Sequence, residues 1–478
     1  MIVMKFGGTS VQDAPSVERV VKIIHKHLPL RPVIVVSAMG KTTRRLLRAA
    51  ELAASGDLTA GLDQLDELRN YHAEILQSLL TVETQPTGTR LREIENLIHD
   101  IAVSAVEARS DVDGYFGEIE PLLTGLSILR ELTPRGRDRI ASYGELMSST
   151  IVTHALRRVG VNAVWLDARA FMMTDESYTR ARPLLDIANP KIVEHIRPRV
   201  QAGQVPVTQG YIGSTTHGIT TTLGFEGSDY TAAIIGAALD VEDIQIWTDV
   251  NGIMTADPAL LPEARTVKVI SFAEAKELTH FGAKVLHPKT LFPAHEKAIP
   301  VHIYNSRQPD APGTVITTDA PPSRTPVKSI AYKKPISLVT ITSHGSSPRL
   351  QFFKQVFDVL ERAQLFTYLA VVSELNVVLA VDPSEAAEPL MLELKREANV
   401  SLTPDQAILC LVGEDLTQVP GLPADVFEAL RDWRFNVISQ GGSAHSLVLI
   451  VGANEVEKAL RRLHDWLFQD SDPEVFAC

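Results

Sequence analysis

The chain has 478 residues, of which 45% are hydrophobic and 22% charged, and its formal net charge is −12. This length exceeds what one hydrophobic core supports, so we expect about three domains. The acidic balance argues against nucleic acid as a partner, and the apolar segments are too short to span a membrane. Two isolated cysteines offer neither a disulfide framework nor a zinc site, which predicts a protein of the reducing cytoplasm.

The first residues of the chain predict a strand, a glycine turn and a helix. An apolar run at residues 2–4 is typical of a buried strand, Lys5 lies at its carboxyl end, and Gly7 and Gly8 follow. Two adjacent glycines leave backbone N–H groups uncovered by side chains, and the start of a helix adds partial positive charge. This combination favours an anion such as phosphate, to which Lys5 adds a mobile cation. Taken alone, a tight turn beside a solvated lysine is the simpler explanation.

A second predicted strand, residues 33–36, ends at Ser37, and Thr43 follows a few residues later. The sequence Gly40-Lys41-Thr42 imitates the end of a P-loop. The position five residues before that glycine is a valine, which excludes the motif. Hydroxyl groups at the carboxyl end of a strand nevertheless lie where α/β proteins bind ligands.

Charged residues follow several later elements. Glu145 lies in a predicted helix, Arg169 follows a predicted strand, and Asp229 precedes a small apolar helix that should be buried. A further strand leads to Thr248 and Asp249. Taken alone, a solvated glutamate and a surface ion pair are the simplest explanations of the first two.

The last third of the chain contains an internal repeat. Three prolines in residues 317–326 predict an extended linker. Beyond it, Val356-Phe357 recurs as Val426-Phe427 and Ser373 recurs as Ser443, with the same spacing of 70 residues and no gap. Each copy is typical of a small unit of strands and helices with an open sheet edge, so the two copies should pair side by side.

The segment Lys5-Phe-Gly-Gly-Thr-Ser-Val11 resembles the N-terminal signature of aspartate kinases, a branch of the amino-acid kinase family. Further blocks of that family match at residues 37–43, 144–146, 244–253 and 281–288. The resemblance implies an α/β fold, a carbamate-kinase-like three-layer sandwich followed by two α+β ACT domains of the ferredoxin-like type. The implied boundaries are a kinase domain at 1–316, a linker at 317–326, a first ACT-like domain at 335–404, and a second at 327–334 plus 405–470.

The same resemblance assigns roles to individual residues. The expected catalytic residues are Lys5, Asp229 and Lys284. The expected ATP-binding residues are Lys5, Gly7, Gly8, Thr248, Asp249, Met254, Lys284 and Val285. The residues expected to bind L-aspartate are Ser37, Thr43, Glu145 and Arg169, with the carboxylate of Glu145 for the amino group and the guanidinium of Arg169 for a carboxylate. Mg²⁺ should be held mainly by the phosphates of ATP, so no protein metal site is predicted.

Four positions depart from the family pattern near the expected nucleotide. Phe225 and Glu226 stand in place of an arginine and a glycine, Ala259 in place of an arginine, and Met254 in place of an aromatic residue. These differences leave open how the nucleotide is held, and they favour one alternative, a non-catalytic amino-acid sensor of the same fold. The retained lysines and aspartate argue against a sensor. A kinase of glutamate or a related acid is a second alternative, against which the paired ACT-like units argue.

The resemblance thus implies a cytoplasmic, ATP-dependent aspartate kinase that opens the lysine, threonine and methionine pathway and forms a homodimer through its ACT domains. The paired units imply an amino-acid effector, and Ser373 and Glu374 match the family's effector site. Tyr368 stands where lysine-sensitive relatives carry an aspartate, and a phenol has no charge at neutral pH. We therefore expect weak or absent inhibition by lysine alone. Threonine, lysine with threonine, or a purely dimerising role for these units remain open.

Overall fold

The computed structural model of the chain describes nearly all of it: residues 1–80, 91–224, 226–282, 288–318, 320–321, 323–344, 348–386, 388–469 and 472–477. The chain divides into two compact units. The first contains Met1–Gly252 and Lys289–Thr318, and the second contains Ile253–Pro288 and Asp319–Cys478.

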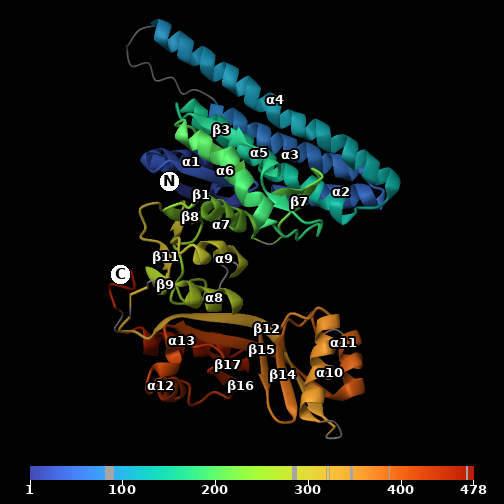
Figure 1. Cartoon of the computed structure of the whole chain (residues 1–478), viewed down its shortest axis with the longest axis vertical. Helices are drawn as coiled ribbons and strands as arrows, with labels where there is room; N and C mark the ends of the chain where they lie inside the picture. Colours follow the sequence, from blue (N-terminus) through green and yellow to red (C-terminus); the bar gives the residue numbers. More distant parts are fainter. Residues whose placement is uncertain are drawn as a thin grey trace. The chain divides into compact units, whose positions relative to one another are not determined.

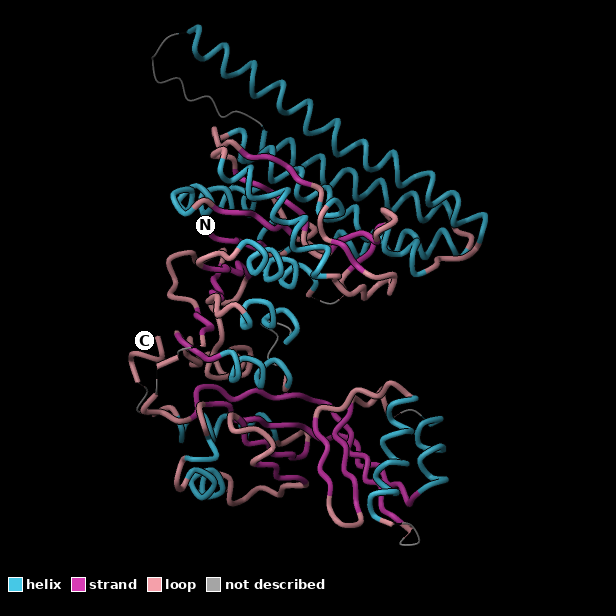
Figure 2. Tube along the Cα trace, viewed as in Figure 1, coloured by secondary structure: helices cyan, strands magenta, loops and turns pink. Residues whose placement is uncertain are grey.

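The first unit is built on a mainly parallel sheet, which Figure 2 shows in magenta among cyan helices. The strands that the first unit contributes have the order β3 (Ala163–Leu166), β5 (Val205–Gln209), β2 (Pro32–Val36), β1 (Ile2–Phe6), β8 (Asp243–Thr248), β10 (Val301–Asn305) and β11 (Thr314–Thr317). Strands β1, β2 and β5 are buried along their whole length, as expected for central strands covered on both faces. Because neighbouring strands from β3 to β10 are parallel, their carboxyl ends lie at one edge of the sheet.

Helices pack against the sheet and against each other in the first unit. Its long helices are α1 (Ala14–His27), α2 (Thr42–Ser55), α3 (Leu58–Leu80), α4 (Leu91–Leu129), α5 (Pro134–Arg158), α6 (Leu185–Gln201) and α7 (Gly227–Leu239). Figure 1 shows α4 running along α3 and α5, and both pairs are in contact. Every residue from Ile140 to Leu156 of α5 is buried, because this helix packs on strands of the sheet and on α2 and α4. The first unit also contains a separate small sheet with the strand order β4 (Met173–Thr174), β6 (Ile212–Thr215) and β7 (Thr220–Thr222).

The second unit contains a six-stranded sheet with the order β13-β14-β12-β15-β17-β16. Its two central strands are unusually long, β12 (Val327–Ser343) and β15 (Ala398–Gly413). The shorter strands are β13 (Leu369–Val372), β14 (Asn376–Val381), β16 (Val437–Gln440) and β17 (Ser446–Gly452). The first half of β12 pairs with the second half of β15, while its second half pairs with both β14 and the first half of β15.

The internal repeat falls on equivalent elements of this sheet. Val356-Phe357 lies in α10 (Arg349–Arg362), and Val426-Phe427 lies in α12 (Leu422–Ala429). Two further helices, α11 (Glu388–Glu397) and α13 (Val456–Leu467), follow β14 and β17 respectively. In the first copy, buried side chains from β12, α10, β14 and α11 form one hydrophobic cluster. Each copy therefore has the helix-covered sheet that its sequence predicts.

The segment Ile253–Pro288 belongs to the second compact unit. It contains β9 (Val269–Ser271) and α8 (Phe272–His280), and α9 (Pro288–Glu296) begins at its end. Its backbone is bound to β12, since Ile330 N donates to Thr255 O at 2.8 Å and Ser329 Oγ donates to Met254 O at 2.7 Å. Chain continuity in the sequence could not reveal this pairing.

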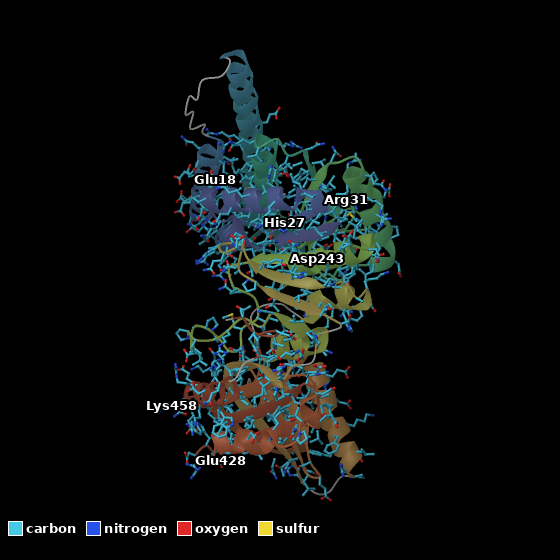
Figure 3. The ribbon with its side chains drawn as sticks, turned by 90° about the vertical axis from the view of Figure 1, so that its left-hand side faces the viewer. Glu18, His27, Arg31, Asp243, Glu428 and Lys458 are labelled. Carbon is cyan, nitrogen blue, oxygen red and sulfur yellow. The ribbon has the colours of Figure 1, made fainter. Side chains whose placement is uncertain are left out.

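Charged side chains of both signs cover both units. Figure 3 labels exposed examples from the first unit, Glu18 and Arg31, and from the second, Glu428 and Lys458. Among the described residues, none of the helices combines the length and the hydropathy that a membrane span requires.

Candidate active site

A buried ion pair lies at the carboxyl end of the central strand β1. The Lys5 ammonium is 2.6 Å from Asp229 Oδ1, and the two side chains are only 9% and 10% exposed. Asp229 is in the first turn of α7, where the helix dipole favours a carboxylate. This contact is an ion pair by distance, and Asp229 Oδ1 has no hydrogen-bond partner among the described residues. The three N–H donors of the ammonium therefore remain suited to an anion at the sheet edge.

The two glycines after β1 serve different purposes. Gly7 N donates to Trp247 O at 3.0 Å, so this amide is already bound to β8. A Cβ atom at Gly8 would lie 2.5 Å from Ala38 O, which no side chain can do without displacing backbone. Gly8 therefore lets this turn approach the loop after β2, and Gly40 N closes the contact by donating to Gly8 O at 2.9 Å. The turn leads into a short 3-10 helix, Gly8–Val11, before α1 begins.

Hydroxyl groups connect this turn to the end of β8, where Thr248 lies. Ser10 Oγ and Ser306 Oγ are 2.8 Å apart, and Ser306 Oγ donates to Thr248 O at 3.0 Å. The Thr248 hydroxyl donates to Asp249 Oδ1 at 3.3 Å. Ser306 belongs to none of the motifs recognised in the sequence. Its position directly after a strand of the parallel sheet was the available signal.

A second cluster combines Glu145, Thr43 and Ser37. Glu145 is 4% exposed, and burial raises the pKa of its carboxyl to about 8, although hydrogen bonds from the backbone of Ala38 and the hydroxyl of Thr43 oppose this rise. Within the described part of the chain, Glu145 Oε2 has no hydrogen-bond partner. Gly144 brings α5 this close, because a Cβ atom there would lie 2.9 Å from Thr43 Oγ1. Ser37 belongs to the same edge, since its N–H donates to Phe6 O at 3.1 Å.

Arg169 is engaged by a neighbour in its own loop. Its Nε donates to both carboxylate oxygens of Asp167 at 3.0 and 3.1 Å, and its Nη2 donates to Asp167 Oδ2 at 2.7 Å. Together these bonds hold the pKa of Arg169 above its usual value, against the opposing effect of burial. The structure thus brings Glu145 and Thr43 together and shows Arg169 in a separate pair.

The other residues discussed for the nucleotide are described less fully. Lys284 and Val285 lie outside the described residues, as does Phe225. Met254 belongs to the second unit, where its sulfur accepts a hydrogen bond from Thr266 Oγ1 at 3.4 Å. Glu226 is the residue before α7 and has a left-handed backbone with φ 54°. No group of three or more histidine, cysteine, aspartate or glutamate side chains arranged to hold a metal ion occurs among the described residues.

The predicted effector residues lie on the hairpin between β13 and β14. Ser373 N donates to Asn376 O at 2.8 Å, and both Ser373 and Glu374 are exposed. Tyr368, just before β13, has the Lys333 ammonium 5.4 Å from its ring centroid. The position at which lysine-sensitive relatives carry an anion therefore faces a cation of this chain.

Comparison with known proteins gives consistent results along the chain. The amino acid kinase family matches residues 1–305, and the ACT domain matches residues 409–467. Lysine-sensitive aspartokinase 3 of Escherichia coli (strain K12) is 34% identical over 98% of this chain and 99% of its own length. Chloroplastic aspartokinase 2 of Arabidopsis thaliana is 33% identical over 98% of this chain and 85% of its own.

Solved structures agree with this result. The crystal structure of E. coli aspartokinase III in complex with aspartate and ADP has a TM-score of 0.80 and 32% identity, and the match covers 98% of this chain and 100% of that chain. The same enzyme in complex with lysine and aspartate has a TM-score of 0.79 and 31% identity, with the same coverage. The fold class predicted from the sequence, an amino-acid-kinase domain followed by ACT domains, is confirmed.

Proposed function

This chain belongs to the aspartokinases within the amino acid kinase family, and from that premise we propose that it transfers the γ-phosphoryl group of ATP to the side-chain carboxylate of L-aspartate. The product is 4-phospho-L-aspartate, the first intermediate on the route to lysine, threonine and methionine. The observation that carries the proposal is the buried Lys5–Asp229 pair at the carboxyl end of the central strand. A lysine with free donors at such an edge is suited to a phosphoryl group in transfer.

Phosphoryl transfer requires positioning and neutralisation of negative charge more than covalent chemistry. Lys5 stabilises the charge that develops on the transferring group, and Asp229 holds the Lys5 ammonium in place. Thr248 and Asp249 bind the nucleoside at the end of the neighbouring strand β8. Lys284 supplies a second cation, and Met254 and Val285 add nucleotide contacts.

When bound together with ATP, Mg²⁺ would supply positive charge that neutralises part of the charge on the phosphates. The residues fit an ion held mainly by the nucleotide, because Asp229, the carboxylate beside Lys5, is already engaged in an ion pair. The protein's own part is to orient the phosphates from Lys5 and the Gly7-Gly8 turn.

The acceptor amino acid binds on the side of Glu145. The free oxygen of Glu145 receives the α-ammonium group of L-aspartate, and the hydroxyls of Thr43 and Ser37 contact its carboxylates. An incoming ammonium favours the ionised form of Glu145, which offsets the effect of burial on its pKa. Arg169 binds a substrate carboxylate by exchanging Asp167 for it.

The C-terminal unit provides regulation and assembly. We infer that the two ACT-like copies form a homodimer and that Ser373 and Glu374 border an amino-acid effector site. Lysine alone is a weak effector, because its ammonium would meet Tyr368 and Lys333 instead of a carboxylate. The enzyme works in the cytoplasm, a setting consistent with its buried free thiol at Cys410.

An aspartate-hydroxamate assay on the purified protein with ATP and Mg²⁺ tests the proposal. We expect hydroxamate formation with L-aspartate and little with L-glutamate. Formation with glutamate instead would assign a kinase of a related acid. Amino-acid binding in calorimetry with no hydroxamate from either substrate would identify a non-catalytic sensor.

A further inference from the structure

Asp138 is a buried carboxylate that the proposed mechanism does not use. It lies near the start of α5, and the residue is 1% exposed. Its oxygens accept four hydrogen bonds: Thr179 N lies 3.0 and 2.9 Å from the two oxygens, Thr222 N donates at 2.9 Å, and Thr222 Oγ1 donates at 2.7 Å. These donors are backbone amides and a hydroxyl, none of them a cation. Burying a carboxylate without a cation costs free energy, so its presence here indicates that the fold depends on these hydrogen bonds.

The four bonds hold three separate segments together. Asp138 belongs to α5, Thr222 ends β7, and Thr179 lies in the loop between β4 and α6. Ala181 N donates to Thr222 O at 2.8 Å, so the loop is also bound directly to β7. Thr179 has a left-handed backbone, with φ 69°, a conformation that a β-branched residue rarely adopts without external support. Asp138 provides that support.

The network continues to the acceptor side of the active site. Leu223 N, next to Thr222, donates to Tyr211 O at 2.9 Å. Burial raises the pKa of Tyr211 to about 12, a rise that hydrogen bonding with the Thr222 side chain opposes and that the nearby carboxyl groups of Glu145 and Asp138 increase. Glu145 itself lies seven residues after Asp138 on α5, which places the two carboxyl groups on the same face of the helix. Tyr211 is also in a left-handed conformation, with φ 68°. Asp138 and Thr222 are therefore joined by a hydrogen bond, and Tyr211 lies near both this pair and Glu145.

We propose that Asp138 is a positioning residue for the acceptor amino acid. It fixes β7, Tyr211 and the 175–182 loop against α5, so that Glu145 meets the substrate ammonium in one geometry. This inference rests on the proposed function, because Glu145 acts on an amino acid only if the chain is an amino-acid kinase. It predicts that damage to the network raises KM for L-aspartate and leaves the nucleotide side unchanged.

The sharpest test replaces one hydroxyl with a methyl group. Thr222→Val removes the donor to Asp138 and the contact with Tyr211 while it keeps the side-chain shape. Thr153→Val is the matched control, because Thr153 is a buried threonine of the first unit whose hydroxyl donates to Ser149 O, at 2.7 Å. We expect KM for L-aspartate to rise about tenfold in Thr222→Val, with KM for ATP unchanged, and neither constant to change in Thr153→Val.

Asp138→Asn and a pH profile extend the test. The amide offers one acceptor oxygen and presents N–H groups to other donors, so it should reproduce the rise in KM for L-aspartate and shift the pH dependence of kcat/KM for that substrate. Equal kinetics in Thr222→Val and Thr153→Val, with an active wild type, would overturn the inference and leave the proposed function standing. A wild type that forms no hydroxamate would overturn both.

Discussion

Each unit of the molecule buries a lysine–carboxylate pair, and the two pairs differ in what surrounds them. Lys5 and Asp229 keep about a tenth of their side-chain surface open at the edge of the parallel sheet. Lys328 and Glu274 in the second unit are 3.0 Å apart and only 1% and 0% exposed. The second pair therefore cannot meet a ligand without local opening.

The carboxylates of the two pairs also differ in their hydrogen bonds to the start of the helix that carries them. Glu274 Oε2 accepts from Ser271 N at 2.8 Å and Ser271 Oγ accepts from Glu274 N at 3.2 Å, a capping box that begins α8. Asp229 makes its ion pair at the start of α7 and is not part of a capping box. A buried ion pair therefore indicates a ligand site only when part of its cation remains accessible. A fully buried pair such as Lys328–Glu274 contributes to the fold instead.

The largest expected effect is on the closed pair. Lys328→Met should lower the free energy of unfolding by about 3–5 kcal/mol, because Glu274 would stay buried without a partner. The kcat of the folded enzyme should stay within about twofold of wild type. Urea unfolding followed by circular dichroism measures the first quantity. Adding Glu274→Gln, which keeps the helix cap and removes the charge, should restore part of the loss. A kinetic defect at unchanged stability would contradict the assignment.

The open pair should respond in the opposite way. Lys5→Ala should lower kcat by about 10²-fold or more, close to 3 kcal/mol of transition-state stabilisation, while the protein keeps its native circular dichroism. Lys22→Ala, an exposed lysine on α1, is the control and should have no effect. Near-normal kcat in Lys5→Ala would remove Lys5 from the active site.

Glu145 is a third buried ionisable group, and its ionisation should be visible in the pH dependence of KM for L-aspartate. Its pKa of about 8 in the folded state exceeds the ordinary value of 4.5, so its contribution to stability is present below about pH 4.5 and is lost as pH rises through 8. Binding of an ammonium needs the ionised form. KM for L-aspartate should therefore fall as pH approaches 8, by up to about tenfold per unit, and then level off. Glu145→Gln should abolish this slope, and a flat wild-type profile would exclude the role.

The pair of Arg169 and Asp167 is more open than either lysine pair, with side chains 23% and 29% exposed. If Arg169 exchanges Asp167 for substrate, Arg169→Lys should raise KM for L-aspartate about tenfold, because an ammonium lacks the bidentate fork. Asp167→Asn should lower this KM or leave it unchanged. An effect on KM for ATP instead would place Arg169 on the nucleotide side.

The smallest effect concerns lysine as an effector. With the Lys333 ammonium over the Tyr368 ring, lysine alone should inhibit the kinase little, whereas Tyr368→Asp should increase inhibition. Titrations of lysine, threonine and both amino acids into the kinase assay provide the measurement. Strong inhibition of the wild type by sub-millimolar lysine alone would show that Tyr368 does not define the site.

Local patterns in the sequence predicted much of this structure. The strand, glycine turn and helix around Lys5 follow from spacing, and the 70-residue repeat identified two copies of one unit without any alignment. Lys5 and Asp229 were named from the family resemblance, and the structure brings them into contact. The first two predictions succeeded because they depend on local spacing or on a repeated pattern, whereas the Lys5–Asp229 contact came from the resemblance, and the catalytic roles of both residues stay predictions.

Several contacts between residues that are distant in the sequence could not be predicted from local patterns. Asp138 is an ordinary polar residue at the start of a helix until its partners, Thr179 and Thr222, are brought to it by the fold. Arg169 was expected to be available for substrate, but its fork is occupied by a carboxylate only two residues away. The grouping of Ile253–Pro288 with the C-terminal unit depends on backbone bonds to β12 that no local pattern encodes.

The two long strands β12 and β15 also determine how the second unit should unfold. Each runs through both copies of the repeat, and register irregularities near Lys333 and Ile336 mark where one copy gives way to the other. Neither copy can unfold without breaking backbone hydrogen bonds of β12 and β15, the two strands that both copies share. A duplicated pair joined by a loose tether would unravel in two stages, whereas this pair should act as one cooperative folding block whose central amides exchange with solvent at a common, slow rate.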